Sequence, residues 1–129
     1  MQGCDETMPG ELLRAVEQFN RREWFECHET LEELWVGARG ELRDFYQGFL
    51  QVAVALHHWR EGNYKGAVLL LEKGPELLRR APPICQGVDV AALIAAAERL
   101  RATLVKLGPG RMEEVDDALL PVVALPARG

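Results

Sequence analysis

The chain has 129 residues, of which 48% are hydrophobic and 27% are charged, and its formal net charge at pH 7 is −5. This length and composition predict a single soluble globular domain. The net negative charge argues against a nucleic-acid partner. Phosphate binding relies on clustered Lys and Arg, which here are scattered as single residues and pairs.

Residues 1–8 are predicted to be flexible, and they contain no apolar segment of the kind found in signal peptides. No apolar run is long enough to span a bilayer, so no membrane partner is expected. The three cysteines, Cys4, Cys27 and Cys85, are odd in number and far apart, which disfavours disulfides and thiolate zinc sites. Together these features predict a cytoplasmic protein.

Apolar residues that recur every three or four positions predict the first three helices. Residues 9–19 form the first helix, residues 22–36 the second and residues 41–60 the third. The third is apolar over most of its circumference, which indicates a central helix with neighbours on several sides. Only a few residues connect the second and third helices, so we expect them to pack antiparallel.

The fourth helix is predicted to begin at about Tyr64 and to kink or split at Gly74-Pro75. Proline lacks the backbone N–H and clashes with the carbonyl four residues before it. Residues 82–88, which begin with two prolines, are predicted to be a loop.

Asp89 is predicted to cap a fifth helix over residues 90–107. Residues 108–129 are predicted to be an extended or partly helical tail, which packs as a strap, covers a partner subunit or is disordered. The sequence therefore predicts an all-α fold, a single-domain bundle of about five helices over residues 9–107 around the central helix at about 41–60.

Polar residues follow one stripe of the central helix and face a second polar group on the preceding helix. We expect the two groups to meet in one interhelical layer, since side chains three and four positions apart share a helix face. Side by side, His57 and His58 diverge by about a third of a turn, so only one of them faces the layer. Helical phase favours His58. The layer and its surroundings consist of His28, Glu29, Glu32, Trp35, Arg43, Gln47, Gln51 and either His57 or His58.

Two interpretations of this layer remain open. In the first, a histidine bonded to a glutamine and a glutamate paired with Arg43 form a buried network that fixes the packing of the helices. In the second, His28, Glu32 and His58 are metal ligands and Glu29 is a general base, because helix bundles build metal sites from Glu and His on facing helices.

Four segments of the chain resemble the bacterial and archaeal family called domain of unknown function 309. They are FNRREWFECHETLEELW, RDFYQGFLQVAVALHH, EGNYKGAVLLLEKG and GVDV, and the resemblance covers roughly residues 11–107. The family signature HExLExxW matches at His28, Glu29, Leu31, Glu32 and Trp35. Its second pattern falls on Arg43, Gln47, Gly48 and His57, whereas helical phase favours His58. The resemblance implies a small all-helical fold around a central helix and no established activity.

The preferred functional hypothesis is a non-enzymatic scaffold or binding module for a protein or small-molecule partner. It would be a homodimer in one version of this hypothesis, and it requires no cofactor. The alternative is a metal-dependent hydrolase or other small-molecule enzyme, which uses a divalent metal held by His28, Glu32 and a central-helix histidine. Gly48 is expected to be a position of close helix packing in both cases.

Overall fold

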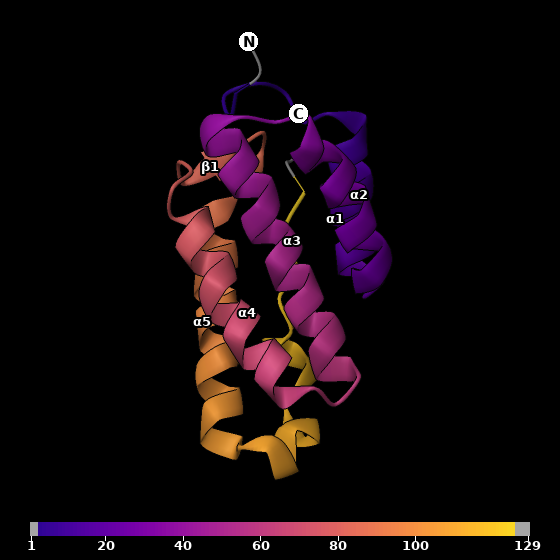
Figure 1. The fold of residues 1–129 in the computed structure, drawn as a ribbon, viewed down its shortest axis with the longest axis vertical. Coiled ribbons are helices and arrows are strands. Elements are labelled where there is room, and N and C mark those ends of the chain that lie inside the picture. Colours follow the sequence, from indigo (N-terminus) through magenta and orange to yellow (C-terminus); the bar gives the residue numbers. More distant parts are fainter. Residues whose placement is uncertain (1–2, 126–129) are drawn as a thin grey trace.

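The computed structural model describes residues 3–125 and confirms the all-α fold. Five α-helices account for most of the chain, and α3 crosses the front of the molecule in Figure 1 with α4 and α5 on one side and α1 and α2 on the other. Among residues 3–125, no helix combines the length and apolar character needed to cross a membrane. The helices are α1 (Gly10–Asn20), α2 (Trp24–Val36), α3 (Gly40–Arg60), α4 (Tyr64–Leu78) and α5 (Val90–Leu107).

The central position of α3 follows from its sequence. Phe45, Phe49 and Val52 are fully buried, together with most of the other apolar side chains of this helix. The rings of Phe49 and Phe19 on α1 meet edge to face, with centroids 5.2 Å apart. A helix that is apolar on several sides is stable only when neighbours cover those sides, as the other helices do here.

The packing of α3 against α4 depends on two facing glycines. A Cβ atom at Gly48 would lie 2.8 Å from Cγ of Leu78 and 2.9 Å from the carbonyl oxygen of Gly74. A Cβ atom at Gly74 would lie 2.8 Å from Cγ2 of Val52. The prediction that Gly48 is a close-packing position is confirmed, because only hydrogen at these two positions allows the helices to approach so closely.

The predicted split of the fourth helix at Pro75 is wrong. Helix α4 continues from Tyr64 to Leu78 with Pro75 buried inside it. Proline removes one hydrogen bond, whereas the buried face on both sides of it, which includes Leu71 and Leu78, packs against the core. Tertiary packing supplies most helical stability in proteins, so it holds the helix together through the proline.

Polar side chains cap the first turns of α4 and α5. The Asp89 carboxylate accepts a hydrogen bond from the backbone N–H of Ala92 at 2.9 Å, which confirms the predicted cap of α5. The Asn63 side chain accepts one from the N–H of Gly66 at 2.9 Å at the start of α4. Each satisfies a backbone donor that the first helical turn leaves free.

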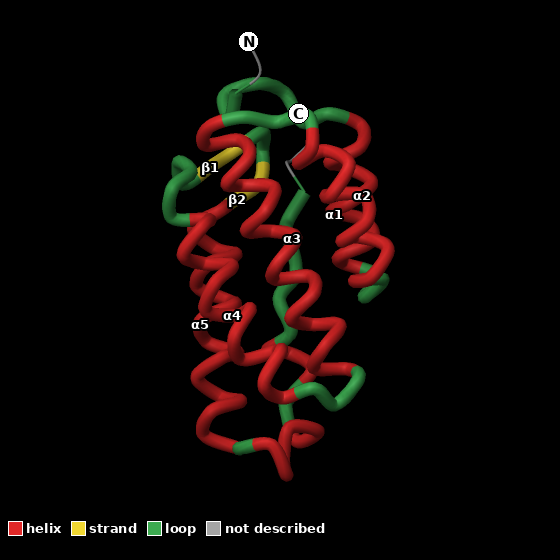
Figure 2. Tube along the Cα trace, viewed as in Figure 1, coloured by secondary structure: helices red, strands yellow, loops and turns green. Residues whose placement is uncertain are grey.

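The segment predicted as a loop contains a short hairpin of β1 (Ile84–Cys85) and β2 (Val88–Asp89), seen in Figure 2. The strands pair antiparallel, with Cys85 opposite Val88. The turn residues Gln86 and Gly87 both have positive φ, at 47° and 85°, as a two-residue hairpin turn requires. Strands of two residues carry no detectable alternation of polar and apolar residues, so the sequence pattern missed them.

The expectation that the cysteines form no disulfide is also wrong. Cys4 and Cys85 are joined in a disulfide across 81 positions of sequence. The backbone N–H of Gln86 donates to the carbonyl of Cys4 at 2.6 Å, and the Tyr46 hydroxyl donates to the Gln86 side chain at 2.6 Å. The segment from Gly3 to Met8, predicted to be flexible, is thus attached to the hairpin at the buried Cys4, while residues 1–2 lie outside the described part.

After α5 the chain forms two 3-10 turns, η1 (Pro109–Glu114) and η2 (Asp117–Leu119), and then runs extended. We call residues 115–125 the C-terminal strap. Figure 1 shows it in yellow, passing behind α3. The last four residues of the predicted tail, 126–129, lie outside the described residues.

Candidate functional site

The candidate site lies along the junction of α2 and α3, which pack antiparallel as predicted. At one end the rings of Trp24 and Trp59 meet edge to face, with centroids 6.3 Å apart. At the other end the Arg43 guanidinium lies over the Trp35 ring, 4.5 Å from its centroid. We call this junction the α2–α3 seam, and its functional candidates are Phe25, His28, Trp35, Arg43 and His57.

An aromatic cluster lies next to the Trp24 end of the seam. The Phe25 ring lies 5.6 Å from the ring of His28 and 5.5 Å from the ring of His57, measured between centroids. Phe25 is 46% exposed, although it is a large apolar side chain. On the same side of α2, Nε2 of His28 lies 3.3 Å from a carboxylate oxygen of Glu32. A phenyl ring thus covers two imidazoles from different helices.

The seam contains most of the buried polar side-chain atoms that have no hydrogen-bond partner in the described part of the protein. These atoms are Nε1 of Trp24, Nδ1 of His28, Nε1 of Trp35 and Nδ1 of His57, and the fifth, Oε1 of Gln51, lies on the stripe of α3 that also carries His58. A buried polar group left unpaired costs about 1–3 kcal/mol, so native proteins contain few of them. Their concentration along one helix junction makes the seam the strongest candidate for a binding site in the described part of the protein.

The single buried network predicted from the sequence is not formed. Arg43 is exposed and lies on Trp35 instead of pairing with Glu32, and Glu32 is itself exposed, with 58% of its side chain accessible. Gln47 is half-buried on the next turn of α3. The Arg43 guanidinium packs on the face of the Trp35 ring, where cation–π attraction stabilises the contact.

Of the two central-helix histidines, His57 is the one whose ring lies beside Phe25 of α2, 5.5 Å away between centroids. His58 instead faces the start of α4, where its Nδ1 lies 3.3 Å from the side-chain nitrogen of Asn63. A Cβ atom at Gly66 would lie 2.7 Å from Cδ2 of His58, so that imidazole fills the space beside the glycine. Helical phase favoured His58 for the stripe of Gln47 and Gln51, and whether His57 or His58 serves the predicted polar layer stays a prediction.

The three predicted metal ligands do not converge. His28 and Glu32 are neighbours, whereas His58 lies at the α3–α4 turn. Within residues 3–125, no group of three or more His, Cys, Asp or Glu side chains is arranged to hold a metal ion. The donor set at the seam therefore does not fit a zinc-like ion, which takes at least three protein ligands.

The predicted general base Glu29 lies on the other side of α2. It lines a groove of about 240 Å³ between α1 and α2, together with Arg14, Glu26 and Glu33. Two buried polar residues of this groove are paired with each other, since the Thr30 hydroxyl donates to the Gln18 side-chain oxygen at 2.7 Å. Glu29 is thus separated from the aromatic cluster.

Cys27 precedes His28 and faces the core. Burial, with a smaller contribution from the negative charge of Glu26, raises the pKa of its thiol far above the ordinary value. A protonated thiol is a poor nucleophile, so Cys27 acts as a small apolar side chain, as its position on the apolar face predicts.

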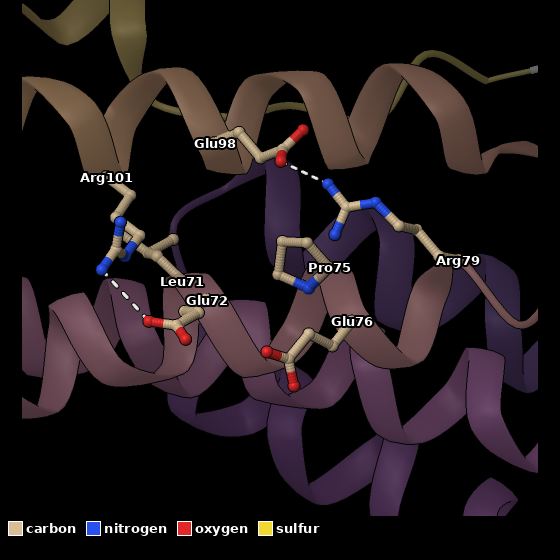
Figure 3. A pocket seen from close by; sticks show the side chains of 7 residues that line it. All are labelled: Leu71, Glu72, Pro75, Glu76, Arg79, Glu98 and Arg101. Carbon is tan, nitrogen blue, oxygen red and sulfur yellow. Dashed lines mark hydrogen bonds and ion pairs between the residues drawn. The ribbon is translucent and has the colours of Figure 1, made fainter.

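A second pocket, of about 240 Å³, lies between α4 and α5, over Leu71 and Pro75. Figure 3 shows two ion pairs across it: Arg79 reaches Glu98, and Arg101 lies 3.1 Å from Glu72. Sequence reasoning missed this pocket because its charged residues lie on the outer helix faces, where charges are usually solvated. Since both arginines are already paired, the pocket has no free cation among its lining residues.

The fold and the seam define a small all-helical protein whose polar and aromatic candidates fall on two consecutive antiparallel helices. Residues 12–70, which include the whole seam, match the family model described as Domain of unknown function (DUF309). The predicted resemblance to this family is therefore confirmed over these residues.

Two curated relatives are similar to this chain. "Uncharacterized protein YpuF" of Bacillus subtilis (strain 168) is 42% identical over 65 residues, which is 50% of this chain and 37% of that protein. An "Uncharacterized protein" of Aquifex aeolicus (strain VF5) is 26% identical over 95 residues, 72% of this chain and 28% of that protein. The matched part of the chain thus spans about a third of the length of these relatives.

Proposed function

We propose that the protein is a non-enzymatic binding module and that the α2–α3 seam receives its ligand, a protein or small molecule. The observation that carries this proposal is the clustering of unpartnered buried polar atoms beside the exposed Phe25 ring. Binding sites combine an apolar surface with a few polar groups that fix orientation, and the seam has both.

The seam also suggests the chemistry of the ligand. When Nε2 of His28 donates to Glu32, the neutral imidazole has its acceptor at Nδ1. A ligand that places an N–H or O–H donor beside an apolar or aromatic group would satisfy this acceptor and cover Phe25. Movement of the Phe25 side chain would open the way to the two imidazoles beneath it.

Nuclear magnetic resonance with a set of small aromatic amides and amines tests this proposal. We expect the fragments that bind to shift the imidazole resonances of His28 and His57 and to leave those of His58 unchanged. His28→Ala should lose this binding, whereas His58→Ala, which changes a histidine outside the seam, should keep it. Fragments that bind His28→Ala as well as the wild type would contradict the assignment of the site.

Elemental analysis separates this proposal from the metal-dependent alternative. Protein purified without a tag or chelator is compared with His28→Ala. Stoichiometric metal that disappears in the variant would favour the enzyme hypothesis over the binding module. We also propose that the protein is cytoplasmic and forms a homodimer. Light scattering after size-exclusion chromatography tests the homodimer.

A further inference from the structure

The side chain of Asn20, at the end of α1, binds the backbone of the C-terminal strap through two hydrogen bonds. The Asn20 side-chain nitrogen donates to the carbonyl of Val123 at 2.8 Å, and the N–H of Val123 donates to the Asn20 side-chain oxygen at 2.8 Å. The amide of Asn20 thus takes the place of a neighbouring strand. Such a pair recognises a peptide group whatever side chain is attached to it.

The strap has the burial pattern of a bound extended peptide. Val123 is 4% exposed and Leu120 is buried as well, whereas Val122 is 67% exposed. The buried side chains belong to the same apolar cluster as the core of the helices. We call Asn20 and the apolar surface covered by Leu120 and Val123 the seat of the strap. The seat therefore recognises two apolar residues three positions apart.

Few hydrogen bonds keep the strap in place. Within residues 121–125, the described backbone hydrogen bonds are the two to Asn20. Before them come turn bonds local to the strap and an exposed ion pair of Asp117 with Arg22, at 3.3 Å. None of the bonds internal to the five helices depends on the strap. Apart from these bonds, the strap is held by its buried apolar side chains, so a peptide that supplies the same side chains could replace it.

A pocket lies at the beginning of the strap. It has a volume of about 340 Å³ and is lined by Trp59, Arg60, Gly62, Met112 and Glu113. The Trp59 ring nitrogen donates to the carbonyl of Met112 at 3.0 Å, at the point where the chain turns towards the strap. A peptide that replaced the strap would also contact the apolar and charged residues of this pocket.

We propose that the seat of the C-terminal strap is a docking site for an extended peptide of a partner protein, and that the strap is its internal competitor. The partner segment has an acidic residue followed by apolar residues three and six positions later, as Asp117, Leu120 and Val123 are spaced. Arg22 attracts the acidic residue, and Asn20 holds the backbone at the last apolar position.

The test uses the full-length chain and a fluorescent synthetic peptide with the sequence of residues 116–125. Val123→Asp places a charge in the apolar seat and displaces the internal strap. Val122→Asp introduces the same charge at a neighbouring exposed position and is the matched control. Because a tethered segment competes at an effective concentration in the millimolar range, we expect Val123→Asp to bind the peptide at least about tenfold more tightly than the control.

Adding Asn20→Ala to Val123→Asp should weaken peptide binding by about tenfold, as expected for the loss of two hydrogen bonds. Equal peptide affinity of Val123→Asp and Val122→Asp, or no binding by either, would overturn the proposal. Loss of the helical circular dichroism in Val123→Asp would also overturn it, because the strap would then be an obligatory part of the core. None of the described hydrogen bonds and ion pairs of the strap involves His28, so His28→Ala should leave peptide binding by Val123→Asp unchanged.

Discussion

At the scale of single residues, Gly48 is the position where a small change should have the largest effect. Gly48→Ala would place a methyl group 2.9 Å from the backbone oxygen of Gly74, which cannot move aside without shifting α4. We expect the free energy of unfolding to fall by about 1–3 kcal/mol, as for other overpacked cores. Gly10→Ala is the control, because no atom lies within 4 Å of the added methyl group there. Urea unfolding of the two variants measures the difference, and equal stabilities would contradict the close approach.

Cys27 should make stability depend on alkaline pH. Burial raises the pKa of its thiol in the folded state, whereas the unfolded chain ionises near its ordinary value of about 8.5. Its contribution to stability is therefore complete below that pH and is lost as the pH rises, by up to about 1.4 kcal/mol per pH unit. Burial also raises the pKa of Tyr46, which adds a loss of the same sign at higher pH.

Unfolding midpoints between pH 7 and pH 10 measure this effect. Cys27→Ala should show a shallower decline than the wild type above about pH 8.5, the ordinary thiol pKa. Its lower stability at pH 7, caused by the lost side-chain volume, does not affect this comparison of slopes. Parallel curves for the two proteins would show that the thiol does not titrate on unfolding.

The contacts of single site residues were the part of the site that the sequence predicted least well. Periodicity placed His28 and Glu32 on one face correctly, because a spacing of four is fixed by helix geometry. It could not choose between His57 and His58, since the two flank the same stripe and the choice depends on Phe25 and Gly66. Arg43 was missed as a partner of Trp35 because a long flexible side chain can reach several neighbours.

At the scale of elements, the cap of α5 can be tested in isolation. Asp89→Ala removes the acceptor for the N–H of Ala92 and should lower the free energy of unfolding by about 0.5–2 kcal/mol. Asp89→Asn keeps an acceptor oxygen at the same place and should retain most of that stability. Thermal unfolding of both variants distinguishes the lost cap from a general effect of removing the negative charge, which would lower both equally.

The helices were predictable because each is specified locally. Apolar spacing, turn residues and a capping aspartate located α3 and α5 to within about one residue of their observed ends. The hairpin and the strap were less accessible, because their places depend on contacts with distant parts of the chain. Gln86 adopts its turn beside Cys4, and Val123 is held by Asn20. Spacing within a segment does not reveal partners of this kind.

At the scale of the whole molecule, the disulfide should contribute strongly to stability. A bridge that closes a loop of this length restricts the unfolded chain and contributes about 4.5 kcal/mol in the loop-entropy model. Reduction with dithiothreitol should therefore lower the melting temperature of the wild type. The Cys4→Ala/Cys85→Ala double variant should melt at a similarly low temperature with or without reductant. A wild-type melting temperature that ignores the reductant would contradict the bridge. Since disulfides are rare in the cytosol, the same measurement bears on the predicted location.

The Cys4–Cys85 bridge also has a mechanical consequence. Helices α1 to α4 lie inside the covalent ring that it closes, whereas α5 and the C-terminal strap lie outside it. A force applied to the two ends of the chain would pass through the sulfur atoms and would bypass the four enclosed helices. The oxidised chain would stretch to roughly 165 Å and the reduced chain to roughly 445 Å, at about 3.3–3.6 Å per residue. Contour length in an optical trap would then report the oxidation state of a single molecule.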